Sequence, residues 1–454
     1  MSERVRSGVN PVAVEATLKA LLGRGLPEVE ILAKRGRSRR FALDGERTAS
    51  SYAEERGWAV RAGDRRGSLF ACGTGDPNPD GPWPPAYPPA LRLPTPVPPP
   101  PWKEPSDFEV PLIGEREGLA LLEGIARELT AELPRGRVLS ATLEDGSSEG
   151  QITSSKGLAA TFRGRLAALR LEVIGPGNPR PARPAVIELA EREARRFNPK
   201  ALARRLADRL AVGAAPGLAE SAERSGDLLL APAVAARLLA GLAPLFFGPR
   251  TDGEISAILG NAIRIGSEAL TLLDDGRYPG GAFESPIDGE GTPTREVTIV
   301  ERGNFLGPVL SPVQARGANP TGAAGSRAQI SGIARRASFR DLPTPGPTHL
   351  YLRPDPKVAV GSLLGSVKIG TYLIDALGPA RVDFSTGSFA LPVCGLAVEN
   401  GKATAPIGHA WLSGEISDLL RGIVGVGRDL AFLPLDGMVG SPTLLVRGLV
   451  LRGR

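Results

Sequence analysis

A proline-rich segment interrupts the N-terminal part of this chain and limits what can form there. The stretch Asp76–Pro105 holds a large share of the 43 prolines of the sequence, with Trp83, Tyr87 and Trp102 among them. Proline lacks a backbone N–H and has a fixed φ, so this stretch can form neither a helix interior nor a central strand, and we expect it to be extended. Two interpretations stay open: a passive surface linker, or a strap whose aromatic side chains dock on folded protein. We call residues 76–105 the Pro-rich strap.

The length of the chain predicts more than one domain. Its 454 residues exceed the roughly 250–300 at which a single hydrophobic core stops growing. Helical and strand patterns occur in blocks without regular alternation, which favours an α+β fold over a doubly wound parallel sheet. We predict an α/β N-terminal domain of helices and antiparallel strands over residues 1–220, which contains the Pro-rich strap, and a β-rich C-terminal domain over residues 221–454.

Hydrophobic spacing predicts the individual elements. The first two strands, 28–34 and 39–43, are expected to turn at the polar residues 35–38, and a second hairpin is expected to turn at residues 63–67. Helices are predicted over 12–22, 115–133, about 185–210, 254–265 and 415–425, and further strands over 57–62, 68–72, 138–143, 151–153, 157–163 and 167–173.

The most apolar stretch, Leu228–Phe247, is predicted to be a buried helix rather than a membrane span. Arg237 lies at its centre, and a central Arg costs roughly 2.5–3.5 kcal/mol on membrane insertion. Pro232 and Pro244 also interrupt the stretch. The charged N-terminus is not followed by the apolar core of a signal peptide, so we expect a soluble, cytoplasmic protein with no membrane partner.

Two residue counts exclude several kinds of site. The only cysteines are Cys72 and Cys394, which cannot form a disulfide scaffold or a thiolate zinc site. The only histidines are His349 and His409, so a two-histidine metal site would need both. The formal net charge of +6 is spread over 55 basic and 49 acidic residues, which is too dilute to indicate a nucleic-acid partner.

One group of carboxylates could hold a hard cation. Its members lie between positions 274 and 290: Asp274, Asp275, Glu284, Asp288 and Glu290. The spacing of a calcium loop, with its terminal Glu, is absent. Asp beside Gly is first of all turn chemistry, so we expect turns here and keep metal binding as the alternative.

A predicted hairpin brings a cysteine and a histidine near each other. Asn-Gly at positions 400–401 is a strong hairpin signal. If these two residues form the loop, Cys394 lies opposite residue 407, and His409 is its diagonal neighbour at roughly 7–8 Å between Cα atoms. A nucleophilic Cys–His dyad could form there, whereas a register slip or a bulge would separate the two. The alternative is a small buried cysteine near a half-buried histidine.

Several blocks, taken in order, resemble the TldD/PmbA family, whose members are known as metallopeptidases and as modulators of DNA gyrase. The resemblance covers about residues 115–454. The blocks are Leu273–Gly281, Asp288–Thr294, Pro343–Thr348, Asp383–Gly387, Val398–Gly401, Leu420–Leu430 and Gly440–Leu449. The chain departs from the family pattern after the second hairpin, where the Pro-rich strap replaces the usual helix.

The resemblance also assigns the positions of a metal site. In the TldD kind of subunit, a His-Glu-x-x-x-His helix and a later Cys hold a metal that activates water, with the Glu as general base. Here the matching positions are Ala231, Pro232 and Ala236, and no Cys lies between Asp429 and Ser441, where the late ligand would fall. Ala and Pro side chains have no donor atom. The resemblance therefore implies a subunit of the PmbA (TldE) kind, with no metal and no other cofactor of its own.

The family implies partners as well. It implies dimers around a central cavity, formed with a TldD-type metallopeptidase subunit or with a second copy of the chain. It also implies binding of unfolded peptide, for which strand addition is suited because backbone pairing is insensitive to sequence. Our first hypothesis is a non-metal subunit that helps in the proteolysis of unfolded peptides. Two alternatives stay open: a homodimeric binding or scaffold protein of the gyrase-modulator type, and an enzyme of altered chemistry that uses Cys394 and His409 on a peptide-like metabolite.

Overall fold

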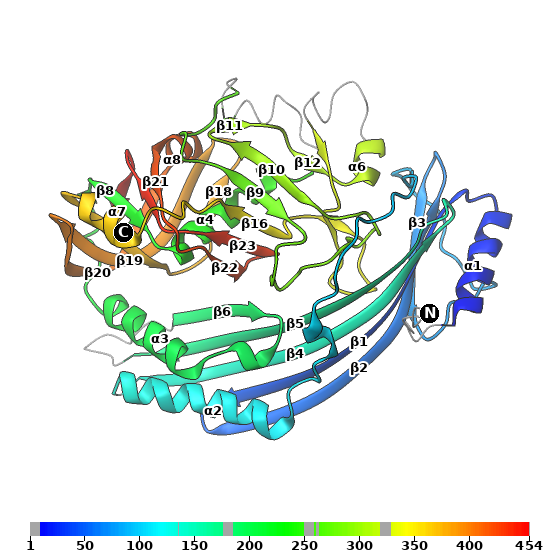
Figure 1. The fold of residues 1–454 in the computed structure, drawn as a ribbon, viewed down its shortest axis with the longest axis horizontal. Coiled ribbons are helices and arrows are strands. Elements are labelled where there is room, and N and C mark those ends of the chain that lie inside the picture. The colour runs from blue at the N-terminus through cyan, green and yellow to red at the C-terminus, as the bar shows by residue number, and fades with distance from the viewer. Residues whose placement is uncertain are drawn as a thin grey trace.

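The computed structural model of the protein describes residues 10–134, 136–175, 185–248, 258–259, 263–317 and 328–453. Its N-terminal half is an antiparallel sheet in the order β3-β2-β1-β4-β5-β6, whose long strands curve around the rest of the molecule (Figure 1). The strands are β1 (Glu28–Asp44), β2 (Arg47–Gly63), β3 (Ser68–Thr74), β4 (Arg137–Ser154), β5 (Ala159–Ile174) and β6 (Ala185–Glu191). The concave face of this sheet looks toward the C-terminal half.

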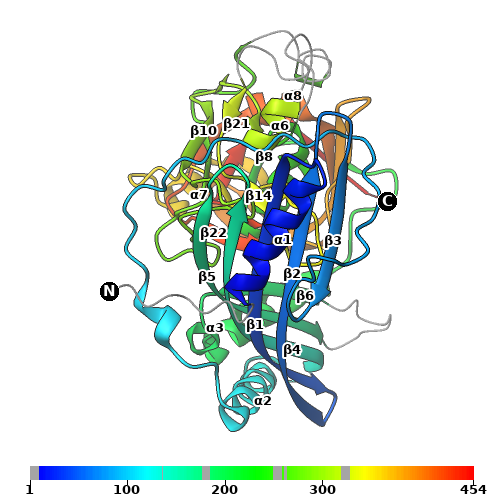
Figure 2. The same cartoon turned by 90° about the vertical axis from the view of Figure 1, so that its right-hand side faces the viewer.

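Three helices pack on the convex face of the sheet. They are α1 (Pro11–Gly23), α2 (Glu115–Glu132) and α3 (Pro199–Gly213), and two short 3-10 turns, η1 (Ser106–Glu109) and η2 (Ala194–Arg196), lie in the connections. Helix α1 lies along β1 and β2 near one end of the sheet (Figure 2), whereas α2 and α3 lie near the other end (Figure 1). The helices predicted over 12–22 and 115–133 are confirmed.

The strands are longer than the hydrophobic pattern predicts, and the predicted turn at residues 35–38 is wrong. Those residues lie in the middle of β1, which continues to Asp44 and pairs with β2 over its full length. Polar residues are tolerated there because their side chains face solvent and pair across the strands, as Arg35 does with Glu54. The chain turns instead at residues 45–46, where Gly45 has a φ of 60° that glycine adopts without strain. Polar residues also lie in the middle of β4 and β5, so β4 joins the predicted strands 138–143 and 151–153, and β5 joins the predicted strands 157–163 and 167–173.

The helix predicted over about 185–210 is also partly wrong. Its first residues form the edge strand β6, and the helix α3 begins only at Pro199. The side chain of Asn198 accepts a hydrogen bond from the N–H of Ala201 at 3.1 Å. An Asn cap followed by Pro in the first turn is a helix start signal, and it marks the boundary that the apolar spacing alone misses.

The C-terminal half contains two larger sheets. One has the order β11-β10-β9-β16-β23-β22 and is formed by β9 (Leu272–Asp275), β10 (Glu296–Glu301), β11 (Asn304–Phe305), β16 (His349–Leu352), β22 (Ala431–Pro434) and β23 (Met438–Ser441). The other has the order β21-β24-β8-β17-β19-β20-β25-β7, with β18 paired to β19. Its strands are β7 (Glu223–Arg224), β8 (Asp227–Leu230), β17 (Ile369–Ala376), β18 (Arg381–Asp383), β19 (Ser388–Glu399), β20 (Lys402–Glu415), β21 (Ile423–Val426), β24 (Leu444–Val446) and β25 (Val450–Arg452).

Smaller elements complete this half. Two short strand pairs join β12 (Val309–Leu310) to β13 (Gln329–Ile330) and β14 (Ala334–Arg335) to β15 (Thr344–Pro345). The helices are α4 (Pro232–Leu242), α6 (Pro312–Gly317), α7 (Val360–Ser366) and α8 (Ile416–Gly422), and the 3-10 turn η3 (Ala243–Leu245) follows α4.

Helix α4 is the centre of the C-terminal core. It packs against β17 of one sheet and against β22 and β23 of the other, and most of its residues are buried. The apolar stretch 228–247 is therefore buried as predicted, although its first residues belong to β8. None of the described helices is long and apolar enough to cross a membrane. The helix predicted over 415–425 is shorter, since β21 begins at Ile423, and the helix predicted over 254–265 falls largely outside the described residues.

The Pro-rich strap lies on folded protein along much of its length. Its backbone pairs with Ser68 of the edge strand β3 through Tyr87, and Leu91 and Leu93 are buried. The half-buried ring of Trp83 packs edge-on against Trp58 with the ring centres 5.8 Å apart. A passive linker would make none of these contacts, so they favour the docked strap.

The α+β fold class is confirmed by these sheets and helices. The N-terminal sheet uses only strands that end before residue 192, and the two larger sheets use only strands that begin after residue 222. This arrangement is what a domain boundary at residues 220/221 would produce, and the boundary itself stays a prediction.

Candidate functional site: a cleft between the two halves

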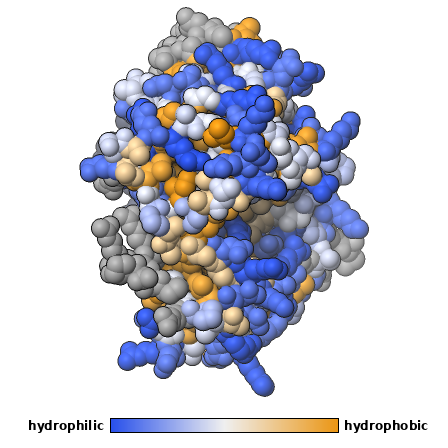
Figure 3. Space-filling model, turned by 90° about the vertical axis from the view of Figure 1, so that its left-hand side faces the viewer, coloured by the Kyte–Doolittle hydropathy of each residue, from blue (hydrophilic) through white to orange (hydrophobic). Residues whose placement is uncertain are grey.

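The concave face of the N-terminal sheet and strand β22 enclose a cleft. Its volume is about 320 Å³, and the molecular surface is hollowed between the two halves when seen from the side of α3 (Figure 3). The polar side chains that line it are Arg40, Thr142, Glu144, Arg170 and Glu188, and Pro434 of β22 lines the opposite wall. We refer to this space as the cleft.

Strand alternation decides which side chains reach the cleft. Successive side chains of a strand point to opposite faces of the sheet. On β1, Phe41 packs into the core under α2 while Arg40 lines the cleft, and on β4 the same holds for Leu143 and Thr142. Because the apolar residues of these strands face the helices, the polar residues that alternate with them face the cleft.

The charges in the cleft are of both signs and are partly exposed. The Nε of Arg170 lies 3.4 Å from Oε1 of Glu188 and its Nη1 lies 3.9 Å from Oε2 of Glu172. The side chain of Arg170 is 50% exposed, so solvent screens these pairs strongly. A cleft with mixed, screened charges has no strong preference for the charge of a ligand.

Two sheet edges meet beside the cleft. Strand β6 is the last strand of the N-terminal sheet, strand β22 is the last strand of a C-terminal sheet, and the two lie next to each other. The backbone groups on the outer side of an edge strand can pair with an added extended chain. The cleft thus combines a polar floor with the type of backbone surface that accepts a peptide strand.

The three positions that the resemblance assigns to a metal site lie at the start of α4. Ala231 precedes the helix and its N–H donates to the carbonyl of Leu373 at 2.9 Å, Pro232 is the first helical residue, and Ala236 is fully buried one turn later. The helix packs on β22 and β23, within the segment where the family's late Cys would fall. The positions that the resemblance assigns to the metal ligands are therefore near each other, but the methyl and pyrrolidine groups there offer no donor atom. The residues do not fit a metal ion.

Buried guanidinium groups lie beside the start of α4 instead. Arg209 of α3 pairs with Asp375 of β17, and burial raises the pKa of Asp375 although the Arg209 charge opposes the shift. Arg237, one residue after Ala236, lies near the same carboxylate, and burial lowers the pKa of its guanidinium. These charges join α3 and α4 to β17.

The predicted hairpin at residues 400–401 is confirmed, but its register is not. Asn400 and Gly401 have φ values of 49° and 75°, as a two-residue turn requires. Gly395, and not Cys394, pairs with Ile407, and the pairing of β19 with β20 is irregular on both sides of this position. The diagonal placement of Cys394 and His409 requires a regular register with Cys394 opposite residue 407, and the structure does not have that register.

The environment of Cys394 also opposes nucleophilic chemistry. Burial raises the pKa of its thiol to about 12, and the nearby charge of Asp375 adds to the shift. Such a thiol stays protonated at neutral pH, and the thiolate is the reactive form. The half-buried ring of His409 packs edge-on against Trp411, with ring centres 6.1 Å apart. We assign no chemistry to this pair.

The predicted group of carboxylates is divided among structural roles. Asp274 is buried and accepts hydrogen bonds from the N–H and the hydroxyl of Thr348 at 2.8 and 2.9 Å, and burial raises its pKa to about 7. The backbone carbonyl of Asp275 accepts from Nδ1 of His349 at 3.0 Å, while Nε2 of His349 accepts from the N–H of Phe283. Burial lowers the pKa of His349 to about 4. Both ring nitrogens of this histidine are thus engaged in holding a loop.

The other three carboxylates are engaged as well. Glu284 pairs with Arg192 at 2.7 Å, Asp288 accepts backbone N–H bonds from its own loop and from Ala334, and Glu290 pairs with Arg61. Among the described residues, no group of three His, Cys, Asp or Glu side chains is placed to hold a metal ion. The turn interpretation of this segment therefore accounts for what the structure shows.

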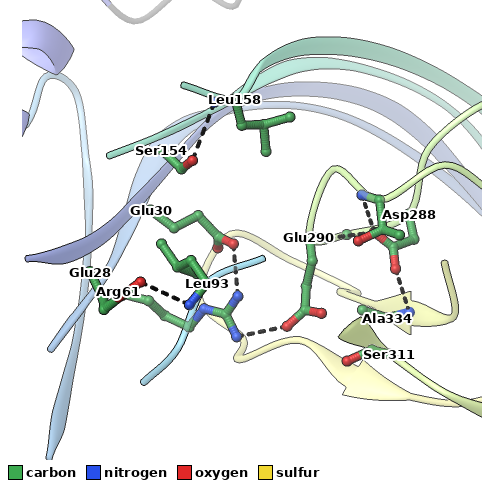
Figure 4. Close-up of polar contacts among 12 residues, drawn as sticks. Glu28, Glu30, Arg61, Leu93, Ser154, Leu158, Asp288, Glu290, Ser311 and Ala334 are labelled. Carbon is green, nitrogen blue, oxygen red and sulfur yellow. Dashed lines mark hydrogen bonds and ion pairs between the residues drawn. The ribbon is translucent and has the colours of Figure 1, made fainter. Parts of the chain in front are cut away.

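A buried ion network joins the two halves at the far end of the concave face (Figure 4). Arg61 of β2 donates from Nη2 to Glu30 of β1 at 2.7 Å and from Nη1 to Glu290 of the C-terminal half at 2.8 Å. Arg336 also pairs with Glu30 and donates from Nε to the carbonyl of Gly289. Burial opposes the ionisation of Glu30, but the charges of Arg61 and Arg336 outweigh it and lower its pKa. We call Glu30, Arg61, Glu290 and Arg336 the junction network.

Sequence reasoning missed the junction network. Arg61 and Glu290 lie 229 residues apart and Glu30 and Arg336 lie 306 apart. Each of these residues alone looks like an ordinary surface charge. The one available signal is weak: Glu30 and Arg61 interrupt predicted strands at positions that alternation assigns to a buried face.

Comparison with known proteins gives matches in sequence and in structure. A family model described as the PmbA/TldA metallopeptidase C-terminal domain matches residues 223–453. A metalloprotease TldD homolog of Buchnera aphidicola subsp. Schizaphis graminum is 29% identical over 179 residues, which are 39% of this chain and 35% of that protein. A metalloprotease of Methanothermobacter thermautotrophicus is 27% identical over 169 residues, 37% of this chain and 34% of that protein. The chain thus spans little more than a third of the length of these two relatives.

Solved structures match over nearly the whole chain. The crystal structure of TldE from Thermococcus kodakarensis has a TM-score of 0.81 and 17% identity, and covers 97% of this chain and 100% of that chain. A candidate modulator of a DNA gyrase from Thermotoga maritima has a TM-score of 0.78 and 18% identity, and covers 97% of this chain and 99% of that chain. At such identities the similarity is one of fold.

Proposed function

The chain belongs to the TldD/PmbA family of metallopeptidases, and from that premise we propose that it is a TldE-type subunit without a metal of its own. In this proposal it binds unfolded peptide in the cleft and helps a TldD-type metallopeptidase partner to process it. One observation supports the proposal: Ala231, Pro232 and Ala236, to which the resemblance assigns the two metal-binding histidines and the catalytic base, lie at the start of α4 and have no side-chain donor atom. A helix without donor atoms at these positions is what we expect of a subunit that shapes a site and leaves hydrolysis to its partner.

The cleft supports the peptide part of the proposal. Its charges are of both signs, so it does not select a ligand by net charge. The edge strands β6 and β22 lie beside it, and edge strands are the elements to which an extended sequence can be added. A folded domain does not fit a space of about 320 Å³, so binding there would select extended chains.

A homodimeric scaffold without peptidase activity is the second candidate. Two of the matching structures are described as candidate modulators of DNA gyrase. This candidate needs neither a metallopeptidase partner nor a peptide. It accounts equally well for the lost ligand positions, so an experiment has to separate the two.

Co-expression with a TldD-type protein from the same genome provides that experiment. We expect the two proteins to purify together through a tag on this chain, and the complex to cleave a labelled unstructured peptide. The chain alone should leave the peptide intact and should hold no stoichiometric zinc or iron by elemental analysis. About one metal ion per chain after dialysis, or cleavage by the chain alone, would contradict the proposal. Failure to purify together would favour the scaffold.

A matched pair of variants tests whether the cleft takes part. Ala168 and Thr161 are both exposed on β5, but alternation places Ala168 in the cleft and Thr161 on the convex face. Ala168→Trp should fill the cleft and slow peptide cleavage by the complex. Thr161→Trp adds the same side chain outside the cleft and should leave cleavage unchanged. Equal rates for both variants would remove the cleft from the proposal.

A further inference from the structure

Strand β2 has a long edge with no neighbouring strand. Strand β3 covers β2 only from Gly57 to Gly63, so residues 47–56 form the outer edge of the N-terminal sheet. Every one of these residues is exposed, and Tyr52 has 55% of its surface exposed. More than half of β2 therefore has solvent on its outer side.

The direction of the backbone groups on this edge follows from the turn. Asp44 pairs with Arg47 across the two-residue loop, and the backbone N–H and C=O groups of two such flanking residues bond to each other. From Arg47 onward, every second residue of β2 therefore bonds to β1 through its backbone, and the residues between them point away from β1. The N–H and C=O groups of Thr48, Ser50, Tyr52 and Glu54 therefore point outward. Within the part of the chain that the structure describes, these groups have no backbone or side-chain partner. The edge ends at Arg56, whose carbonyl accepts the N–H of Gly75 at 3.4 Å.

The centre of this edge lacks the usual protection against pairing. Exposed edge strands are commonly blocked by charged residues, by proline or by a bulge. Residues 48–53 are Thr, Ala, Ser, Ser, Tyr and Ala, and their pairing with β1 is regular. A flat, uncharged edge of this length accepts another strand readily.

The charges at the two ends of the edge select what that strand is. Arg47 lies at its start, and Glu54 and Glu55 lie at its end. An antiparallel copy of the same edge places the start of one strand at the end of the other, so opposite charges meet at both ends. A parallel copy would place like charges together, which is unfavourable.

One register satisfies both the hydrogen bonds and the charges. Outward-pointing residues must lie opposite outward-pointing residues, which allows a two-fold axis at Ser51. Ser50 then faces Tyr52 of the second copy, and Arg47 faces Glu55 of the second copy at both ends of the ladder. The side chains of Arg47 and Glu55 lie on the same face of the sheet, so they can form two symmetrical ion pairs.

We propose that the open edge of β2, residues 47–55, is a dimer surface at which it pairs antiparallel with the same edge of a second copy of this chain. The two sheets then continue into each other, and the two-fold axis is perpendicular to the joined sheet. Both concave faces, and therefore both clefts, open on the same side of the dimer. The inference is independent of the proposed function, because it requires neither a peptidase partner nor a peptide.

Light scattering of the full-length protein over a series of concentrations tests the surface. Ser50→Pro removes an outward N–H that makes no bond within the described chain, and proline is tolerated at such edge positions. We expect it to weaken dimerisation roughly tenfold or more, because two ladder hydrogen bonds are lost in each dimer. Ser50→Ala keeps the N–H but loses the same hydroxyl contact with Glu115, and should dimerise like the wild type. Thermal unfolding of both variants checks that the sheet remains folded.

A charge exchange tests the register separately. Arg47→Glu places like charges opposite each other at both ends and should weaken the dimer. Adding Glu55→Arg to the same chain restores two opposite pairs and should recover dimerisation, although the pair that Glu55 makes with Arg340 is lost. Recovery is expected only if these two positions face each other.

Four results would overturn the proposal or its register. A monomeric wild type at micromolar concentration, or a Ser50→Pro variant that is folded and dimerises normally, excludes the edge as the dimer surface. A double charge variant that fails to recover excludes the register at Ser51. If Ser50→Pro abolishes binding of a labelled unstructured peptide but leaves the dimer intact, the edge binds peptide and the second copy binds elsewhere.

Discussion

The two ends of the concave face are made from the same kinds of residue and have opposite properties. At the junction network, Glu30, Arg61 and Glu290 are at most 8% exposed, and buried Leu91 and Leu93 of the Pro-rich strap lie close by, where the N–H of Leu93 donates to Glu28. In the cleft, Arg170 pairs with Glu188 across solvent-exposed space. Burial is thus the difference between a charge pair that fastens two halves and one that leaves room for a ligand.

The two ends also differ in how the sheet is held to the C-terminal half. The junction network ties β1 and β2 to the C-terminal half through buried ion pairs. Toward β6 the contact is between two strand edges, and the sheet is held by α3 through Arg209. The cleft lies at the end where the contact is made by strand edges and by α3.

Removing the central cation of the junction network should have the largest effect. Arg61→Met leaves the carboxylates of Glu30 and Glu290 buried and facing a thioether. Breaking a buried ion pair in this way costs about 3–5 kcal/mol, so we expect the free energy of unfolding in urea to fall by that amount at pH 7. Glu30 keeps its pair with Arg336, so adding Glu290→Gln removes the carboxylate that loses its partner and should recover part of the loss. Losses that simply add would show that the network is not the cause.

Asp274 should make the stability fall as the pH rises. Burial raises its pKa to about 7 in the folded protein from 3.8, so between about pH 4 and 7 the folded state holds a proton that the unfolded state releases. The stability due to this group is present below about pH 4 and is lost as the pH approaches 7, with a slope of up to about 1.4 kcal/mol per pH unit. Asp274→Asn keeps the bonds to Thr348 and should remove this slope from urea titrations across that range. Glu30, whose pKa is lowered, acts in the opposite direction at acid pH, and its contribution should remain.

The Pro-rich strap should contribute an intermediate amount to stability. Trp83 packs on Trp58, and the ring of Trp102 contacts Phe108 while its Nε1 donates to Glu284 of the C-terminal half. Both tryptophans are half-buried, so replacing either by Ala should cost about 1–2 kcal/mol, below the 3–5 of a fully buried Trp. Tyr87 is 66% exposed, and Tyr87→Ala serves as the control with little expected change. A Trp83→Ala, Trp102→Ala protein that unfolds like the wild type would mean that the segment is only a linker.

The smallest effect on stability is expected at the open end of the concave face. Arg170→Ala removes a half-exposed charge and its screened pair with Glu188, so the free energy of unfolding should change by less than about 0.5 kcal/mol. If the cleft binds peptide, the same variant should alter the affinity for a labelled unstructured peptide, measured by fluorescence anisotropy. A loss of stability comparable to that of Arg61→Met would remove the distinction between the two ends.

Local signals allowed part of the fold to be predicted. The Asn400-Gly401 turn, the helix that begins at Pro11 and the helix that begins at Glu115 are set by residues within a few positions. The predicted turn at residues 35–38 is wrong because polar residues resemble a loop unless the cross-strand partners are known. The Asn198 cap is a local signal for the start of α3, and apolar spacing alone does not include it.

The candidate site divides in the same way. The resemblance in sequence assigns Ala231, Pro232 and Ala236 to the ligand and base positions, and a side chain without a donor atom cannot bind a metal in any fold. The lining of the cleft and the free edge of β2 could not be assigned. They depend on where β22 meets β6 and on where β3 stops covering its neighbour, and neither is encoded within a short window.

The sequence by itself determined what depends on covalent structure and near neighbours: an extended segment where proline excludes other structure, a tight turn at Asn-Gly, and the absence of metal donors at the start of α4. Only the tertiary structure decided the register that places Gly395, and not Cys394, opposite Ile407, and the burial that joins Arg61 to Glu290 across 229 residues. The physical reason is that the energy of a charge or a thiol depends on its distance from water and from other charges. Those distances are set by packing between segments far apart in the chain, so they become known only when the chain is folded.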